Sequence, residues 1–170
     1  MDKTPRERII QWLTDAHSME SEAETMLKAT ASRIEHYPLL KERIEQHIVE
    51  TQGQAQRIER RLEALGSSKS TAKNMIASAM ASMQAAGHAT MSDEVLKSLG
   101  VSYAFEHMEI ASYRNLLIAA EALGDMETAQ LCRETLPEEE AMAQWLFENQ
   151  QTLVGQFLAL DEAEGVSAKR

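Results

Sequence analysis

The sequence has little of what holds small secreted or turn-rich proteins together. Its 170 residues include one cysteine, three prolines and seven glycines, so an internal disulfide is excluded and a β-sandwich or barrel is disfavoured. No apolar run approaches the roughly 18 residues that a membrane-spanning helix needs, and no signal-peptide core follows the N-terminus. A lone cysteine, Cys132, suits a reducing compartment. We therefore expect a soluble, cytoplasmic protein.

Basic residues are also in short supply. Twenty-seven acidic residues against 17 basic ones give a net charge of −10, which repels phosphate backbones and anionic lipid, so neither nucleic acid nor membrane is an expected partner. Hydrophobic residues make up 44% of the chain, a globular composition rich in strong helix formers. The length suits one domain. The composition predicts an all-α protein.

Four long helices are predicted from apolar residues at helical spacing and from capping signals. Thr4 and Glu7 form a capping-box pattern at the first start, and Pro38 ends the first helix. Gly66 and Gly124 suit positions just beyond helix C-termini. The predicted helices span about 4–34, 39–65, 92–123 and 125–160, the last with a kink at Pro137.

A Met- and Ala-rich segment at about 70–86 is predicted as a short helix between the second and third long helices. Four long helices with one long crossover are typical of a ferritin-like bundle. We therefore predict a single ferritin-like four-helix bundle domain over residues 1–160, with a short additional helix in the crossover. Residues 161–170 are predicted as a polar, frayed tail.

Several carboxylates fall on helix faces that should be buried. At about 100° per residue, Glu20 and Glu139 lie in the middle of the apolar stripes of the first and last helices. Glu106 and Glu109 are three residues apart and share a face of the third helix, with Tyr113 one turn further as a hydrogen-bond donor. A bare carboxylate in a bundle core costs several kcal/mol unless it is protonated, paired or metal-bound. Carboxylate oxygens suit iron or manganese.

Two interpretations of these glutamates stay open. In the first, they hold metal ions between the helices. In the second, they pair with Arg or Lys in a structural network, although such residues are nearly absent from the same stripes. Histidines on a facing helix are a further kind of partner. The metal interpretation is the better supported of the two.

Five segments resemble the bacterial YciE/YciF stress-protein family, whose fold is ferritin-like. They are WLTDAHSMESE, HIVETQGQAQRIE, FEHMEIASYRNL, LGDMETAQL and ETLPEEEAMAQWL. The resemblance implies paired antiparallel helices, a homodimer and a rubrerythrin-like metal site. It places the metal ligands at Glu20, Glu50, Glu106, Glu109 and Glu139. For Glu50 the resemblance is the only support, because helical phase puts it on a polar flank of its helix beside Arg43, Gln54 and Arg57.

The sequence departs from the usual di-iron pattern. Catalytic di-iron bundles commonly carry Glu-x-x-His on two helices, whereas Gly53 and Met142 occupy those histidine positions here. His47 and His17 are the nearest nitrogen donors. His47, three residues before Glu50, could reach the site, although we expect it to be a hydrogen-bonding or surface residue. Metal binding is therefore better supported than redox turnover.

The sequence supports two functions. The first is a stress-response protein that binds one or two iron or manganese ions through core carboxylates, without an organic cofactor, and carries out ferroxidase or peroxide-linked chemistry. The alternative is a non-catalytic helical dimer that acts through protein association. Ile110 and Leu117 are apolar positions expected to lie outside the bundle-facing stripes and to serve a second interface.

Overall fold

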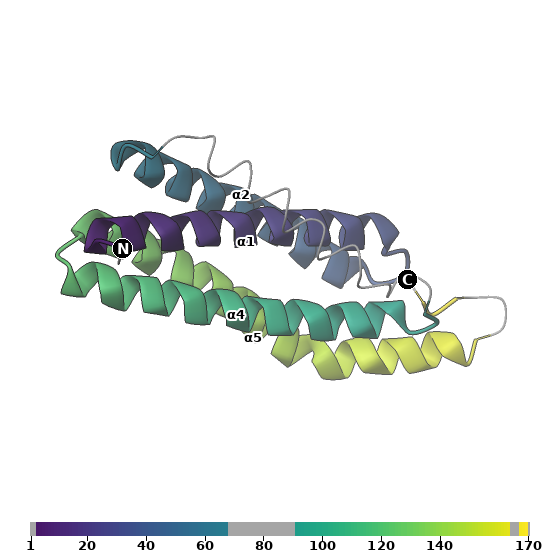
Figure 1. Cartoon of the computed structure of the whole chain (residues 1–170). Helices are drawn as coiled ribbons and strands as arrows, with labels where there is room; N and C mark the ends of the chain where they lie inside the picture. Colours follow the sequence, from purple (N-terminus) through teal and green to yellow (C-terminus); the bar gives the residue numbers. More distant parts are fainter. Residues whose placement is uncertain (1–2, 68–90, 164–166, 170) are drawn as a thin grey trace.

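The computed structural model describes residues 3–67, 91–163 and 167–169, and this part of the chain is built from four long helices (Figure 1). They are α1 (Pro5–Arg33), α2 (Pro38–Ala64), α4 (Glu94–Ala122) and α5 (Met126–Asp161). No strand occurs among the described residues. The all-α prediction is confirmed, while the predicted crossover helix at 70–86 lies outside the described residues.

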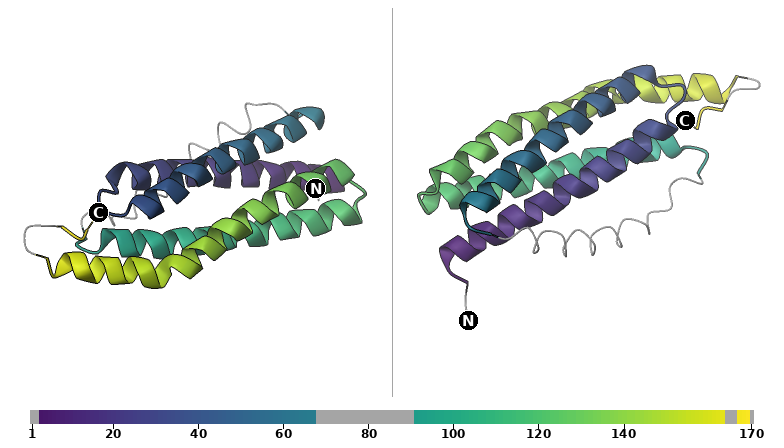
Figure 2. Two further views of the ribbon diagram at one scale, coloured as in Figure 1. Left: turned by 180° about the vertical axis from the view of Figure 1, so that it is seen from behind. Right: turned by 90° about the horizontal axis from the view of Figure 1, so that it is seen from above.

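The helices form two antiparallel hairpins, α1 with α2 and α4 with α5, which pack face to face (Figures 1 and 2). Helix α1 contacts α4, and α2 contacts α5. Because α2 ends and α4 begins at opposite ends of the bundle (Figure 2), the two hairpins are related as in a ferritin-like bundle with one long connection. No helix in the described part is both long and apolar enough to cross a bilayer.

The helix ends follow the signals in the sequence. The Glu7 amide donates to Thr4 Oγ1 at 3.3 Å and the Thr4 amide donates to Glu7 Oε2 at 2.7 Å, which completes the capping box. Gly66 and Gly124 adopt φ of 70° and 72°, a left-handed conformation that favours glycine. Helix α4 begins at Glu94, two residues later than predicted. Helix α5 continues through Pro137 to Asp161.

The C-terminal tail is attached to the bundle, so the expected fraying is wrong for residues 167–169. Ala168 is buried, and its carbonyl accepts a hydrogen bond of 2.6 Å from Tyr37 Oη. The Val95 amide donates to the Lys169 carbonyl at 3.2 Å. The tail is polar in composition, but its backbone satisfies donors of α4 and of the α1–α2 turn.

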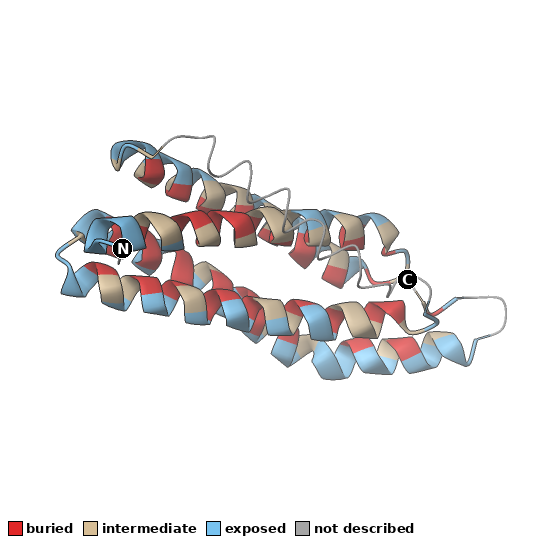
Figure 3. Cartoon of the chain, viewed as in Figure 1, coloured by how far each residue is buried: buried red, intermediate tan, exposed pale blue. Residues whose placement is uncertain are grey.

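The bundle core follows the predicted apolar stripes on α1 and α5, and on α2 it includes Ile44, Ile58 and Leu62 of the predicted stripe Ile44, Ile48, Ala55, Ile58 and Leu62 (Figure 3). Between Ile44 and Ile58, however, the buried positions of α2 are polar: His47, Thr51 and Gln54. The predicted stripe had Ile48 and Ala55 there, and both are only partly buried. The polar face turns inward because it meets the buried glutamates of the other helices.

Two smaller predictions concern single side chains. Ile110 is buried in the core, so the expectation that it lies on an outer face is wrong; Leu117 is partly buried. Cys132 is a small, buried side chain of α5. Burial raises the pKa of its thiol to about 12, which makes it an inert thiol.

Candidate metal centre

Four glutamates from three helices are buried in the middle of the bundle. Glu20 comes from α1, Glu106 and Glu109 from α4, and Glu139 from α5, and each is at most 1% exposed. No Lys or Arg of the described residues forms an ion pair with any of them. The described residues therefore do not form the alternative structural network, in which Lys or Arg would pair with these glutamates.

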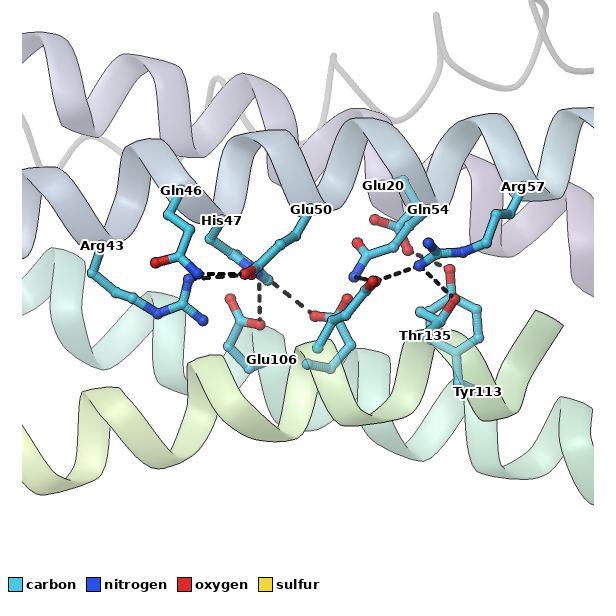
Figure 4. Close-up of polar contacts among 12 residues, drawn as sticks. Glu20, Arg43, Gln46, His47, Glu50, Gln54, Arg57, Glu106, Tyr113 and Thr135 are labelled. Atoms are coloured by element: carbon cyan, nitrogen blue, oxygen red, sulfur yellow. Dashed lines mark hydrogen bonds and ion pairs between the residues drawn. The ribbon is translucent and has the colours of Figure 1, made fainter. Parts of the chain in front are cut away.

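The partner of these carboxylates is His47 on α2. Its side chain is fully buried, with Nε2 at 3.1 Å from Glu106 Oε2 and 3.6 Å from Glu139 Oε2 (Figure 4). Both distances are within the range of an ion pair, but neither contact has the geometry of a hydrogen bond. One donor atom from each of the three residues lies within 4.8 Å of the others. Of the two roles expected for His47, the surface role is wrong, while the hydrogen-bonding role agrees with its contact with Glu50. The group of His47, Glu106 and Glu139 could hold a metal ion.

Glu50 lies behind His47 and not among the buried carboxylates. His47 Nδ1 is 2.7 Å from Glu50 Oε2, the oxygen to which Arg43 Nη1 also donates at 3.1 Å. Gln46 Nε2 donates to the other oxygen at 2.9 Å. Burial would raise the pKa of Glu50, but His47 and Arg43 outweigh it and lower that pKa. An ionised Glu50 holds Nδ1 and so directs Nε2 toward Glu106 and Glu139.

Most of the other carboxylate oxygens of the centre lack a hydrogen-bond partner. Tyr113 Oη donates to Glu20 Oε1, which fits the predicted donor role. Glu20 Oε2, Glu109 Oε1 and both oxygens of Glu139 are buried without a hydrogen-bond partner. Buried oxygens without partners are rare because each loses its hydration. Together with one imidazole they form a donor set that fits a divalent cation such as Fe(II) or Mn(II).

The metal-free centre binds protons tightly. Burial, reinforced by the nearby Glu20 charge, raises the pKa of Glu139 to about 10. Burial also raises the pKa of Glu20 to about 8 and that of Glu109 well above its ordinary value. For His47, burial opposes the charged form, but Glu106 and Glu50 raise its pKa to about 10. A bound cation would replace these protons.

A second polar network closes the other end of the centre, and sequence reasoning missed it. Arg57 Nη2 contacts Glu138 Oε2 and donates to Thr135 Oγ1 at 3.3 Å. Gln54 Nε2 donates to the same oxygen of Glu138 at 3.0 Å. The available signal was the spacing of Arg43, Glu50, Gln54 and Arg57, which places them on one flank of α2 that faces α5.

The comparisons with known proteins agree with this fold. A family model described as a domain of unknown function (DUF892) matches residues 4–159. The protein YciF of Escherichia coli K12 is 33% identical over 145 residues, which cover 82% of this chain and 86% of YciF.

Solved structures with the same fold include proteins from three bacteria. The crystal structure of a Xanthomonas campestris protein matches with a TM-score of 0.80 at 48% identity, covering 94% of this chain and all of that one. The crystal structure of the Escherichia coli stress protein YciF gives a TM-score of 0.69 at 26% identity, covering 91% and 99%. YcfI from Rhodopseudomonas palustris, at 23% identity, a TM-score of 0.66 and coverage of 85% and 93%, shares the fold. By its family match and its YciF relative, this chain belongs to the DUF892 family of YciE/YciF-like proteins.

Proposed function

We propose that this protein is a cytoplasmic stress-response protein that binds one or two iron or manganese ions between its four helices. The observation that carries the proposal is the convergence of His47, Glu106 and Glu139, all fully or almost fully buried, with donor atoms within 4.8 Å of one another. Glu20 and Glu109 supply further buried carboxylates beside them. A cation would compensate the carboxylate charge that His47 alone does not, since no Lys or Arg of the described part pairs with these glutamates.

The donor set indicates which ions would fit. Carboxylates suit Mn(II), and imidazole together with carboxylate suits Fe(II). Iron or manganese bound here would supply one-electron transfer to dioxygen or to a peroxide, which is the basis for proposing ferroxidase or peroxide-linked chemistry. The stress role follows from the likeness to the stress protein YciF.

The residues around the donors position them and control protons. Glu50 fixes the orientation of the His47 ring through Nδ1. Tyr113 donates to Glu20 and so restrains that carboxylate. The surrounding buried side chains keep bulk water from the donors, which strengthens every electrostatic interaction in the centre.

Elemental analysis of protein purified without a metal-chelating tag tests the proposal. After anaerobic loading with Fe(II) and desalting, we expect one to two ions per chain. His47→Gln is expected to lose at least one of them, because it removes the only nitrogen donor of the group. His107→Gln changes an exposed histidine and should bind as wild type does. Loaded wild-type protein without bound metal would exclude the proposal.

The alternative, a non-catalytic dimer that acts by protein association, is favoured by the outer face of α4. Exposed apolar residues recur there at alternating spacings of three and four, the repeat of a coiled-coil seam. They are Val101, Ala104, Met108, Ala111 and Ile118, with Asn115 continuing the repeat. A second copy of the chain placed on this row would bury it, so we propose a homodimer for either function.

Light scattering on a gel-filtration column tests the dimer. We expect wild-type protein to elute with the mass of two chains, and Met108→Glu to shift the equilibrium toward one chain because it puts a charge in the middle of the row. Phe147→Glu, at an exposed apolar position of α5 outside the row, is the matched control. A dimer that withstands Met108→Glu would place the interface elsewhere.

A further inference from the structure

The two ends of the buried centre offer different ligands. Resting on the proposed function, we infer that the centre fills in a fixed order. A first ion binds at His47, Glu106 and Glu139, and a second binds more weakly among Glu20, Glu109 and Glu139, beside the positive charge of Arg57. The two positions therefore differ in metal affinity because different residues surround them.

The first position has a prepared nitrogen donor. His47 is oriented by Glu50, which is itself held by Arg43 and Gln46. A ligand fixed by such outer partners needs no rearrangement on binding, and loss of outer partners typically weakens metal sites by about 10–100-fold. Its Nε2 already lies within 3.6 Å of an oxygen of both Glu106 and Glu139.

Among the described residues, His47 is the only histidine with a ring nitrogen at ion-pair distance from a carboxylate of the centre; His17 Nε2 instead contacts Glu59 Oε1 at 3.1 Å. The second position is therefore built from carboxylates. Three residues after Glu50 stands Gly53, and a side chain there would meet Arg57, whose Nη1 lies 3.8 Å from the Cβ position. The space next to Gly53 is therefore bordered by a guanidinium group. Three residues after Glu139 stands Met142, fully buried, whose thioether is a poor ligand for hard cations.

Arg57 also places a fixed positive charge at this end. A guanidinium stays protonated in proteins, and Figure 4 shows Arg57 on the same side of the centre as Glu20 and Tyr113, away from His47 and Arg43. Its pairing with Glu138 keeps it in place. Repulsion between this charge and a second cation lowers the affinity of the second position relative to the first.

Titration with Mn(II), followed by the EPR signal of free Mn(II), measures both affinities. We expect two phases in wild-type protein, with dissociation constants at least about tenfold apart. Glu20→Gln is expected to remove the weaker phase and leave the tighter one. His47→Gln is expected to remove the tighter phase. Circular dichroism checks that each variant retains its helices.

The sharpest variant is Arg57→Gln combined with Glu138→Gln, which removes the ion pair and leaves the net charge unchanged. It should tighten the weaker phase by about tenfold and leave the first phase in place. Two equal phases in wild-type protein, or a weaker phase insensitive to Arg57, would overturn the inference while the proposed function stands. No Mn(II) or Fe(II) binding by any variant would overturn both.

Discussion

Replacing Glu20 and Glu139 together by glutamine is expected to raise the unfolding temperature of the metal-free protein and to abolish its metal binding. Both side chains are buried without a Lys or Arg partner, and glutamine has nearly the same shape without a proton to retain. Stability and metal binding should therefore change in opposite directions. That opposition is typical of a functional site, which keeps charges that the fold alone would discard.

The size of the effect follows from the proton affinities. With a pKa of about 10, Glu139 stays protonated at pH 7 in the folded chain, while an unfolded glutamate releases its proton near pH 4.5. Keeping one such proton costs roughly 3 kcal/mol at pH 7. Because Glu20 and Glu139 influence each other, we expect about 1–4 kcal/mol in total. For a chain of this size each kcal/mol moves the unfolding temperature by about 2–4 °C.

Thermal unfolding in the presence of a chelator, together with elemental analysis after Fe(II) loading, measures both consequences. Glu148→Gln is the matched control, because Glu148 is an exposed glutamate on the same helix as Glu139; it should change neither quantity. A double variant that is less stable than wild type without metal would show that the two carboxylates contribute to the fold itself. Full retention of metal would remove them from the ligand set.

The fold could be predicted from the sequence because its determinants are local. Apolar periodicity and helix caps depend on neighbours within a few residues, and the capping box at Thr4 and the left-handed glycines at Gly66 and Gly124 formed as predicted. Glu20 and Glu139 were identifiable for the same reason, since each interrupts an otherwise apolar stripe. Burial of an isolated polar residue on such a stripe is visible in the phase alone.

The inward positions of His47 and Arg57 could not be predicted from hydrophobic periodicity. The inward face of α2 is polar between Ile44 and Ile58. Hydrophobic periodicity correctly placed these two isoleucines inside, but between them it put Ile48 and Ala55 inside instead of His47 and Gln54. That face is buried because it meets the carboxylates of three other helices, and the positions of those carboxylates depend on tertiary packing. A row of polar residues at spacings of three and four opposite buried glutamates is the signal that could have identified it.

The stability of the metal-free protein is expected to fall as the pH rises from about 5 to 8. Glu20, Glu109 and Glu139 have raised pKa values in the folded chain, so between pH 4.5 and those values the folded state keeps protons that the unfolded state has released. The same sign applies to His47, whose pKa rises from 6.5 to about 10. Their stabilising contribution is complete below the unfolded pKa values and is lost on the way up to the folded ones.

Below pH 5 other groups act in the opposite sense. Burial would raise the pKa of Asp125, but the Thr128 amide and Arg61 outweigh it and lower that pKa, and the pKa of Glu50 is also lowered. Their contribution is present above the unfolded pKa and is lost as the pH falls. The metal-free protein should therefore be most stable near pH 5, at the acidic end of the usual range of about pH 5–8.

Unfolding temperatures measured with a chelator at half-unit steps from pH 4 to 8.5 test this expectation. One group with a strongly raised pKa lowers the free energy of unfolding by about 1.4 kcal/mol per pH unit. The resulting fall in unfolding temperature should exceed the scatter between buffers. The Glu20→Gln/Glu139→Gln variant should show a much flatter profile above pH 5. A flat profile in the wild-type protein would mean that the buried carboxylates are already compensated without metal.

Saturating Mn(II) should counteract the fall in stability that the metal-free protein shows as the pH rises. Metal binding needs ionised carboxylates and a neutral imidazole at Nε2, so its affinity rises with pH as the competing protons leave. A ligand that binds only the folded state stabilises it by an amount that grows with this affinity. Mn(II) is therefore expected to raise the unfolding temperature little at pH 5 and strongly at pH 8. Equal stabilisation at both pH values would indicate an ion bound at the acidic surface and not in the buried centre, because only the centre couples metal to protons.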